Sequence, residues 1–357
     1  MISAETVREI QKLGTDLRTR LVAGAATQLP TTLYHYTDAA GLMGIVTSGT
    51  VWATHYAYLN DASEFKYAVG VMKDVVEKAT ADAAPGTWKG RFRHVISEDN
   101  NPSVYSTDWT QNAGEQQFVA CFSERSDSLS QWRGYGKSIG GYSLGFQVAD
   151  LQASAKRIND SQAGKTSTEA NPFITVEFLP CWYNQQKQNA LIAEGFERAL
   201  HHCETTRYPV DDSSLAMLLR AILKPVSSCF KDPAFTDEHE WRLVVRVLRP
   251  GLGGVGFGDA RERTQDEMRM DQIATVHFRS GEYSLAPYVV LPVVLDAALS
   301  LSQVVVGPTP LPENARVAAI QLLFPDREGC PTTTAATARR KIVCTQVTNS
   351  TIPFRRV

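Results

Sequence analysis

The sequence predicts an α+β protein, because strand-like and helix-like segments mix along its 357 residues without a regular strand–helix–strand alternation. Short runs rich in Val, Tyr, Phe and Trp are typical of strands, whereas apolar residues spaced three and four apart indicate helices. The apolar content of 43% is enough to bury a large core.

The first part of the chain predicts a long helix, then a strand, a helix and a second strand. Residues 1–28 have the pattern of an amphipathic helix that ends in a loop, and residues 32–37 (TLYHYT) are typical of a short strand. Asp38 is suited to cap the next helix and Gly49 is suited to end it. Residues 50–56 then predict a strand, which a polar loop connects to a further helix.

The rest of the chain predicts strands and helices with two long polar segments between them. Residues 82–115 and 151–171 are polar, and we expect both to be loops. Helices are expected at about 185–205 and 212–230, and residues 239–249 predict a strand with clear alternation. Further strands are expected at 115–124, 140–148, 171–183, 276–281, 286–292, 301–308 and 341–347, and a helix at 313–324.

Length and pattern together predict an N-terminal helix over 1–28 and a single α+β catalytic-like domain over 29–357, with a helical insertion near 185–230.

The composition excludes some partners. The 36 basic and 38 acidic side chains give a formal charge of -2, so the chain lacks the excess of basic residues of a protein that coats nucleic acid or an anionic membrane. The N-terminal helix is too charged for a signal peptide, and no segment approaches the ~20 apolar residues of a membrane span. The six cysteines form no CxxC pair and are expected to be reduced thiols, so we predict a cytoplasmic protein with no membrane partner.

Three polar residues interrupt apolar strands and are the main candidates for a functional site: His35, Ser123 and Glu240. A lone strand histidine such as His35 is more often a satisfied core group than a site residue. Ser123 is expected where a buried strand meets a loop, which is a common place for site residues. Glu238 and Glu240 are expected to point to the same face of a strand or of its entry, and Arg242 shares that face. Either an exposed ion pair or a carboxylate held for a ligand explains this pattern.

Two other patterns have simpler structural explanations. Gly251, Gly253 and Gly256 match a dinucleotide-binding glycine pattern, but the charged segment after them lacks the apolar face that the required helix needs. We expect a loop there. Cys121 has neither a base nor a cause of a lowered pKa near it in the sequence, so we treat it as a packing residue.

Further candidates gather around two short segments. Trp132, Arg133 and Tyr135 combine flat rings with a guanidinium, which suits stacking on a planar ligand, although packing alone also explains Trp132. Asn60 and Asp61 precede a predicted helix, and ordinary helix capping explains Asp61 well.

A set of short motifs in a fixed order resembles a bacterial family known only as a domain of unknown function. The motifs are LYHYT at 33–37, Ile45 with Gly49, LND at 59–61 with Glu64, CFSE at 121–124, Trp132 with Tyr135, Gly141 with Gly145 and Phe146, EWR at 240–242, Pro287-Tyr288, Gly307-Pro308, and Ile352-Pro353 with Arg355. The resemblance spans roughly residues 31–355. Each motif is short, but their order makes the set specific. The family description itself implies no activity.

A more distant resemblance, to ADP-ribosyltransferases of the His-Tyr-Glu type, implies an activity. Such proteins carry a His on an early strand, an aromatic residue after the next elements and a Glu on a late strand, and several toxin branches have Glu-x-Glu at the last place. Here His35 and Glu238-x-Glu240 occur in that order. The resemblance implies an ADP-ribosyltransferase-like split β-sheet core with helical insertions.

The sequence also departs from that pattern. No Ser-Thr-Ser strand is evident, although the segment ending in Ser123 is its nearest counterpart, and the spacing from Ser123 to Glu240 requires an insertion. The tyrosine is not determined among Tyr36, Tyr67 and Tyr135.

The resemblance assigns roles for breaking the bond between nicotinamide and ribose in NAD, which is the substrate. Glu240, oriented by Arg242, would hydrogen-bond the ribose 2′-OH as oxocarbenium-like charge develops. His35 would bond the ribose hydroxyls of the adenosine side, a Tyr ring would stack on nicotinamide, and Ser123 or Asn60 would support the pocket. The candidate catalytic residues are Glu240, Glu238, His35 and Ser123, and the candidate ligand contacts are His35, Tyr36, Thr37, Asn60, Tyr67, Trp132, Arg133, Tyr135 and Arg242.

We therefore predict an ADP-ribosyltransferase-like enzyme that transfers ADP-ribose from NAD to a nucleic-acid or protein acceptor. A bacterial toxin or phage-defence effector, with an antitoxin or another regulatory partner, is the biological setting that this predicts. Two alternatives stay open. One is a hydrolase of nucleic acid or nucleotides with His35, Asp61 and Glu240 around a divalent metal. The other is a non-catalytic binding or sensing module.

Overall fold

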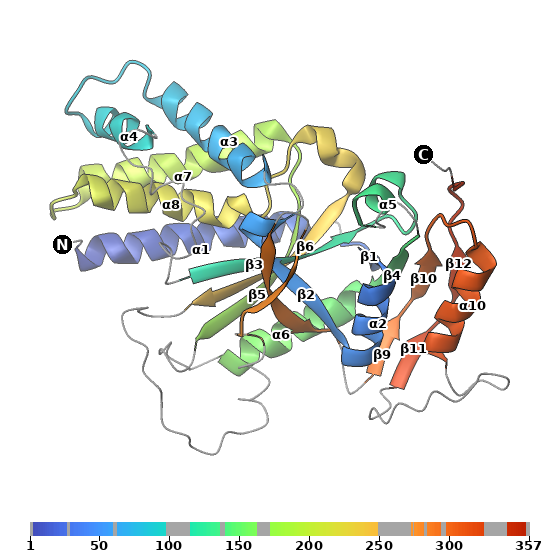
Figure 1. Ribbon diagram of the computed structural model, residues 1–357. Helices are drawn as coiled ribbons and strands as arrows, with labels where there is room; N and C mark the ends of the chain where they lie inside the picture. Colours follow the sequence, from blue (N-terminus) through green and yellow to red (C-terminus); the bar gives the residue numbers. More distant parts are fainter. Residues whose placement is uncertain are drawn as a thin grey trace. The chain divides into compact units, whose positions relative to one another are not determined.

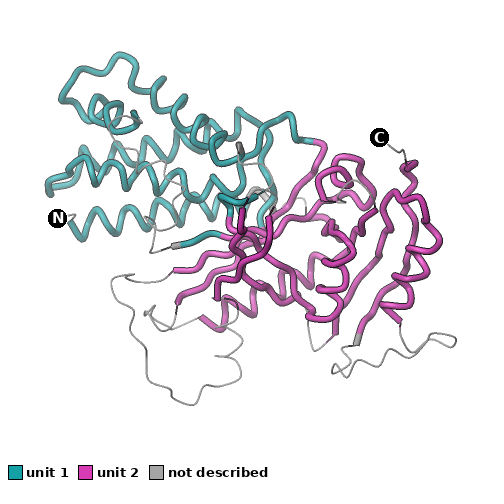
Figure 2. Tube along the Cα trace, in the orientation of Figure 1, with its two compact units in different colours: residues 1–27, 56–117, 179–236 teal, residues 28–55, 118–178, 237–357 magenta. Residues whose placement is uncertain are grey.

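The structure is a computed structural model that combines helices with a mixed β-sheet, which confirms the expected α+β class (Figure 1). It describes residues 3–26, 29–59, 63–97, 115–135, 140–162, 172–248, 273, 275–281, 284–293, 298–324 and 341–354. The chain divides into two compact units (Figure 2). The helical unit comprises residues 1–27, 56–117 and 179–236, and the sheet unit comprises residues 28–55, 118–178 and 237–357.

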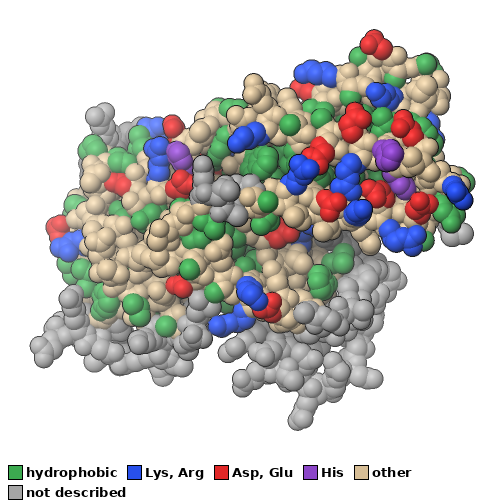
Figure 3. Space-filling model, turned by 180° about the vertical axis from the view of Figure 1, so that it is seen from behind, with side chains coloured by type: hydrophobic (Ala, Val, Ile, Leu, Met, Phe, Trp, Pro, Cys, Tyr) green, Lys and Arg blue, Asp and Glu red, His purple; other side chains and the backbone are tan. Residues whose placement is uncertain are grey.

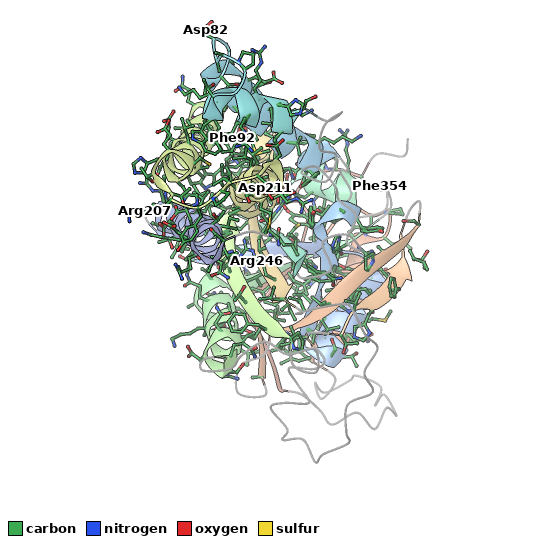
Figure 4. All side chains as sticks on the ribbon, turned by 90° about the vertical axis from the view of Figure 1, so that its left-hand side faces the viewer. Asp82, Phe92, Arg207, Asp211, Arg246 and Phe354 are labelled. Carbon is green, nitrogen blue, oxygen red and sulfur yellow. The ribbon has the colours of Figure 1, made fainter. Side chains whose placement is uncertain are left out.

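The helical unit is built from amphipathic helices whose apolar stripes pack together. Its helices are α1 (Ala4–Ala26), α3 (Ser63–Ala79), α4 (Trp88–Ile96), α7 (Gln185–Thr205) and α8 (Asp212–Ser227), with short 3-10 helices η1 (Tyr56–Tyr58) and, at its end, η3 (Pro233–Glu238). Asn184 and Asp211 cap α7 and α8 by accepting hydrogen bonds from backbone N–H groups. Phe92 of α4 meets Phe196 of α7 edge to face at 5.2 Å, and Figure 4 shows Phe92 among these helices.

The expectation of a loop over 82–115 was wrong for the part that forms α4. Thr87 caps this helix, because its hydroxyl accepts the Gly90 N–H at 3.1 Å. Phe92, Val95 and Ile96 are buried on one side of it. In the sequence, the only signals for this helix are one capping residue and three apolar residues. Within a polar segment these were too few to predict a helix.

The expectation of a loop over 151–171 was also wrong for residues 151–162, which belong to α6 (Val148–Gln162), and residues 163–171 lie outside the described residues. Its buried stripe includes Leu151, Ala155 and Ile158, at helical spacing. Polar residues on the remaining faces mask this narrow stripe in the sequence.

The sheet unit holds a sheet that contains both parallel and antiparallel strand pairs. Its strands are β1 (Thr32–Thr37), β2 (Thr50–His55), β3 (Glu115–Ser123), β4 (Tyr142–Gln147), β5 (Phe173–Pro180), β6 (Glu240–Leu248), β7 (His277–Ser280), β8 (Leu285–Pro292), β10 (Gln303–Val306) and β12 (Val347–Asn349). The order is β12-β10-β4-β1-β3-β2-β8-β7, with β6 pairing with β3 and β5 pairing with β6. A separate parallel pair joins β9 (Ala298–Leu301) to β11 (Lys341–Cys344). Helices α2 (Ala39–Ser48), α5 (Leu129–Tyr135), α6 and α10 (Pro312–Leu323) complete the unit.

The centre of the sheet is β3, with which β1, β2 and β6 all pair. β1 pairs with β3 where Tyr34 lies opposite Ser123. β2 pairs with β3 farther back along it, where Thr54 lies opposite Val119. β1 and β2 therefore pair with β3 at separate points, and Cys121 lies between these points along β3.

The helix that connects β1 to β2 follows the sequence expectation closely. Asp38 caps α2 by accepting the Gly41 N–H at 2.8 Å. Gly49 ends the helix with φ of 65°, and its N–H donates to the Ile45 carbonyl at 2.7 Å. Both predicted ends of this helix are confirmed.

Within the described residues, the charged side chains are mixed in sign and the cysteines are free thiols. On the face seen in Figure 3, basic and acidic side chains are interspersed over the helical unit, and Arg198 bridges α7 to Glu9 and Asp16 of α1. None of the helices in the described ranges is both long and apolar enough to cross a membrane. The described cysteines are free thiols at positions 121, 181, 203, 229 and 344.

His55, the last residue of β2, makes the stability of the sheet unit depend on pH. Burial lowers the pKa of its imidazole from 6.5 to about 4. Between these values the unfolded chain binds a proton that the folded chain does not, so the free energy of unfolding rises with pH across this window. At about 1.4 kcal/mol per pKa unit, acidification from above the upper value to the lower one should cost about 3 kcal/mol.

Urea denaturation at a series of pH values checks this expectation. His55→Gln should reduce the slope of unfolding free energy against pH, whatever it does to the stability at neutral pH. His201→Gln, at an exposed position of α7, should leave the slope unchanged. A His55→Gln protein that retains the full slope would contradict the assignment.

Candidate functional site

The main sequence candidates lie on three neighbouring strands of the sheet unit. His35 is on β1 and Ser123 ends β3, and the two strands pair through Tyr34 and Ser123. Glu240 begins β6, which also pairs with β3, and the Glu124 N–H donates to the His239 carbonyl at 3.1 Å. The fold therefore brings all three residues to the same end of β3.

His35 is held in one tautomer by the backbone of β3. Its Nδ1 lies 2.9 Å from the Cys121 carbonyl oxygen, which can only accept, so Nδ1 must carry the hydrogen. Burial lowers the pKa of His35, with the Cys121 carbonyl as a weaker opposing influence, so the ring is neutral at pH 7. Nε2 is thus an acceptor, and no residue in the described ranges hydrogen-bonds it. The ring packs against Phe122 at 5.5 Å.

Ser123 connects the end of β3 to the segment that precedes β6. Its hydroxyl donates to the Glu238 carbonyl at 2.7 Å and accepts the Arg125 N–H at 3.1 Å. The side chain is buried. With both bonds made to backbone groups, Ser123 fixes where the Glu238 backbone lies.

Glu238 lies at the entry to β6 and not within the strand. Glu238 ends η3, β6 begins at Glu240, and His239 between them has φ of 44°. A non-glycine residue in the left-handed region is strained, and such strain is concentrated at functional sites. Glu238 is half-buried, whereas Glu240 is buried.

Glu240 forms a two-point ion pair with Arg242. Arg242 donates from Nε to Glu240 Oε1 at 2.7 Å and from Nη2 to Oε2 at 3.0 Å. The two side chains are 3% and 2% exposed, so an exposed ion pair is the wrong explanation of this motif. Farther along β6, Arg246 pairs with Glu177 of β5, and Figure 4 marks Arg246.

Side-chain alternation separates Glu240 from His35. The Trp241 indole N–H donates to Glu124 Oε1 at 2.8 Å, so Trp241 shares a face with Glu124. Glu240 precedes Trp241 on β6 and therefore points to the opposite face. His35 contacts Phe122, which is two residues before Glu124 and shares its side.

A polar cluster that sequence reasoning missed lies at the end of β3, beside His239. Arg125 Nη2 is 3.0 Å from His239 Nε2, and Glu124 Oε2 is 3.7 Å from His239 Nδ1. The only sequence signal was a run of polar residues immediately after a buried strand. Because the partners are more than 110 residues apart, their proximity depends on the pairing of β3 with β6.

Tyr36 and Trp132 are core residues of the sheet unit. Their rings meet edge to face at 4.6 Å, and Trp132 is 6% exposed. The Tyr36 hydroxyl donates to the Arg125 carbonyl at 2.7 Å and accepts the Ser128 N–H at 3.0 Å. A Cβ atom at Gly307 would lie 2.8 Å from the Trp132 ring. Neighbouring residues thus already cover both aromatic side chains.

Asp127 ties this aromatic core to the C-terminal segment. Its carboxylate accepts the Trp132 indole N–H at 2.7 Å, the Ser350 hydroxyl at 2.6 Å and the Thr351 N–H at 2.7 Å. Burial raises the pKa of Asp127, but these hydrogen bonds outweigh it and hold the pKa below the ordinary value. Ile352 packs against the same aromatic residues.

The remaining sequence candidates are spread over the chain. Tyr135 packs half-buried against the aromatic core, Arg133 is exposed on α5, and Thr37 ends β1. Tyr67 belongs to the helical unit, where its hydroxyl donates to Gln188 Oε1 at 2.7 Å. Asn60, Asp61, Gly251, Gly253 and Gly256 lie outside the described residues. Within the described ranges, no group of three or more His, Cys, Asp or Glu side chains is placed to hold a metal ion.

Comparison with known proteins gives a match of part of the chain to one family, and no activity. Residues 131–243 match a family described as "Protein of unknown function (DUF2971)". This range includes Trp132 and the Glu240-Trp241-Arg242 motif, whereas His35 and Ser123 precede it. No curated protein and no solved structure matches the chain.

Proposed function

We propose that this protein is an ADP-ribosyltransferase-like enzyme that cleaves NAD and transfers ADP-ribose to a macromolecular acceptor, either nucleic acid or protein. The observation that carries the proposal is the state of His35. A neutral imidazole, fixed through Nδ1 by the Cys121 carbonyl of β3, offers Nε2 as an acceptor for a ligand hydroxyl.

The pairing of β1 and β2 with β3 also supports the proposal. β1 and β2 leave β3 at separate points, which suits the split core of the enzyme class that the sequence resembles. The chemistry of the side chains also fits NAD, whose ribose hydroxyls need acceptors such as an imidazole nitrogen and a carboxylate.

The burial of Glu240 shifts the proposed catalytic role to Glu238. Both oxygens of Glu240 are held by Arg242 in a nearly inaccessible place, so this pair positions the start of β6. Glu238 is half-buried and can meet a ligand, and Ser123 fixes its backbone. In this proposal Glu238 supplies the catalytic carboxylate, and Ser123, Glu240 and Arg242 are positioning residues.

NAD supplies an ADP-ribosyl group whose bond to nicotinamide breaks with the electron pair leaving on the nicotinamide nitrogen. The Glu238 carboxylate accepts a hydrogen bond from the ribose 2′-OH, and this bond strengthens as positive charge develops on the sugar. The acceptor forms the new bond to the same carbon, and Glu238 takes the proton that the acceptor loses. His35 holds a second hydroxyl through Nε2 and keeps its own proton throughout. The setting as a bacterial toxin or phage-defence effector with a regulatory partner is part of the same proposal.

Nicotinamide release from NAD by the purified protein, with cell extract as a source of acceptor, tests the proposal. Glu238→Gln should lower turnover by about two decades or more, because the neutral amide does not stabilise the developing charge. Its matched control is Asp237→Asn, which changes the adjacent, exposed acid of η3 and should leave turnover unchanged.

The outcome also separates catalysis from folding. A Glu238→Gln protein with the thermal stability of the wild type and full turnover would remove the proposed role of Glu238. Absence of nicotinamide release by the wild type across extracts from several bacteria would remove the proposed activity.

A further inference from the structure

Three neighbouring strands of the sheet unit carry aromatic rings that the proposed chemistry does not use. Trp52 of β2 stacks on Tyr288 of β8, with 4.4 Å between the ring centroids and 27° between the ring planes. Tyr288 lies beside His277 of β7, at 5.4 Å and 30°. We call these three rings the ring ladder.

The strand register places the ring ladder on one face of the sheet. Tyr288 lies opposite both Thr54 and His277, and Trp52 is two residues before Thr54 on β2. Their side chains therefore point to the same side. The residues that alternate with them on β2 and β8 are buried and face the other way: Val51, Ala53, Val289 and Leu291. Trp52 itself is 50% exposed, which leaves ring surface open to a ligand.

Arg279 brings positive charge to the same face. It lies opposite Ala286, whose small side chain leaves room for the guanidinium to cross β8. Nη2 of Arg279 then donates to Thr54 Oγ1 of β2 at 3.1 Å. Its Nε makes no hydrogen bond to any described residue. The described side chains of this face include Trp52, Thr54, His277, Arg279, Tyr288 and Val290, and none of these is acidic.

We propose that this face binds single-stranded nucleic acid, with a base stacked on Trp52 and a phosphate near Arg279. Aromatic rings on an open sheet face stack on unpaired bases with little regard to sequence, and nearby cations attract the backbone. A duplex keeps its base faces stacked inside the helix, so the ring ladder requires a single strand. A carbohydrate would also lie on Trp52, but its hydroxyls need acceptors, and none of the described side chains named for this face is a carboxylate. The inference does not depend on the use of NAD.

Fluorescence anisotropy with labelled oligo(dT) and oligo(rU), compared with a duplex of equal length, tests the inference on the full-length protein. We expect the single strands to bind more tightly than the duplex. Trp52→Ala should weaken single-strand binding by about tenfold or more, because base stacking on an aromatic ring typically contributes a factor of about 5 to 150. Trp52→Phe, which keeps a ring, should retain most of the affinity.

Phe278→Ala is the matched control. Phe278 follows His277 on β7, is 54% exposed and points to the opposite face of the strand. The Phe278→Ala protein should bind the single strand with the affinity of the wild type. Arg279→Gln is a second variant, and it should weaken binding and reduce its dependence on salt.

Several outcomes would overturn the inference. These are absence of single-strand binding, equal or tighter binding of the duplex, full affinity of Trp52→Ala, and equal losses in Trp52→Ala and Phe278→Ala. Binding of neutral oligosaccharides in place of the oligonucleotides would assign the face to a carbohydrate and would also overturn it.

Discussion

Glu240→Gln is expected to lower the free energy of unfolding by about 3–5 kcal/mol, because it removes the negative charge from a buried two-point ion pair. The Arg242 side chain is 2% exposed and bonds both oxygens of Glu240. Gln is neutral and presents a single oxygen, so it cannot reproduce a two-point bond to a carboxylate. The sequence resemblance implies a catalytic role for Glu240, whereas its burial against Arg242 makes stability the property that this variant should change.

A double variant separates the loss of a charge partner from the loss of packing. Glu240→Leu combined with Arg242→Met replaces the buried pair with apolar side chains and should be less destabilised than either single variant. Chemical denaturation of the wild type, Glu240→Leu, Arg242→Met and the double variant gives the free energy of interaction between the two side chains. Asp160→Asn, which breaks an exposed ion pair with Lys156, is the control and should change stability little. Equal stabilities of Glu240→Gln and the wild type would show that the pair is not buried as described.

Trp132→Ala is expected to destabilise the protein by about 3–5 kcal/mol, as is usual when a buried aromatic side chain is removed from a core. Its ring packs against Tyr36 and Gly307, and its indole N–H is bonded to Asp127. Trp132→Phe keeps most of the packing and removes only the hydrogen bond, so its loss should be nearer 1 kcal/mol. Chemical denaturation measures both.

Trp52→Ala is the matched control for this comparison, since Trp52 is half exposed where Trp132 is buried. Its stability should change much less. If Trp132 instead stacks on a ligand, Trp132→Ala should keep the wild-type stability and lose ligand binding, and that pattern would contradict the packing role. The same experiment therefore separates the two roles that the sequence left open for this residue.

The motifs that suggested a family owe much of their pattern to this aromatic core. Gly307 allows the Trp132 ring to approach the backbone, and a Cβ atom at Gly145 would lie 2.9 Å from the Tyr34 ring. Ile352 brings the C-terminal segment to the same rings. The packing of the aromatic core therefore explains why these motif residues are needed more directly than a catalytic role does.

Local signals predicted many elements of the fold correctly. The strand over 32–37, the helix that Asp38 caps and Gly49 ends, and the helices near 185–205 and 212–230 are present as expected. The failures were α4 and α6, whose narrow apolar stripes lie within polar segments. Short-range patterns predict elements well where capping and periodicity agree, and poorly where only one signal is present.

The sequence by itself determined the class of the fold, most of its strands and the residue types available for chemistry, because these depend on neighbours along the chain. Tertiary structure decided which of those residues are accessible. It buried Glu240 against Arg242, left Glu238 half-buried after a strained His239, and set Trp132 in the core while Trp52 stayed exposed. Burial and pairing depend on contacts between strands that are more than 80 residues apart in the sequence, such as β1 beside β3. A pattern of neighbouring residues does not predict which distant strands pair.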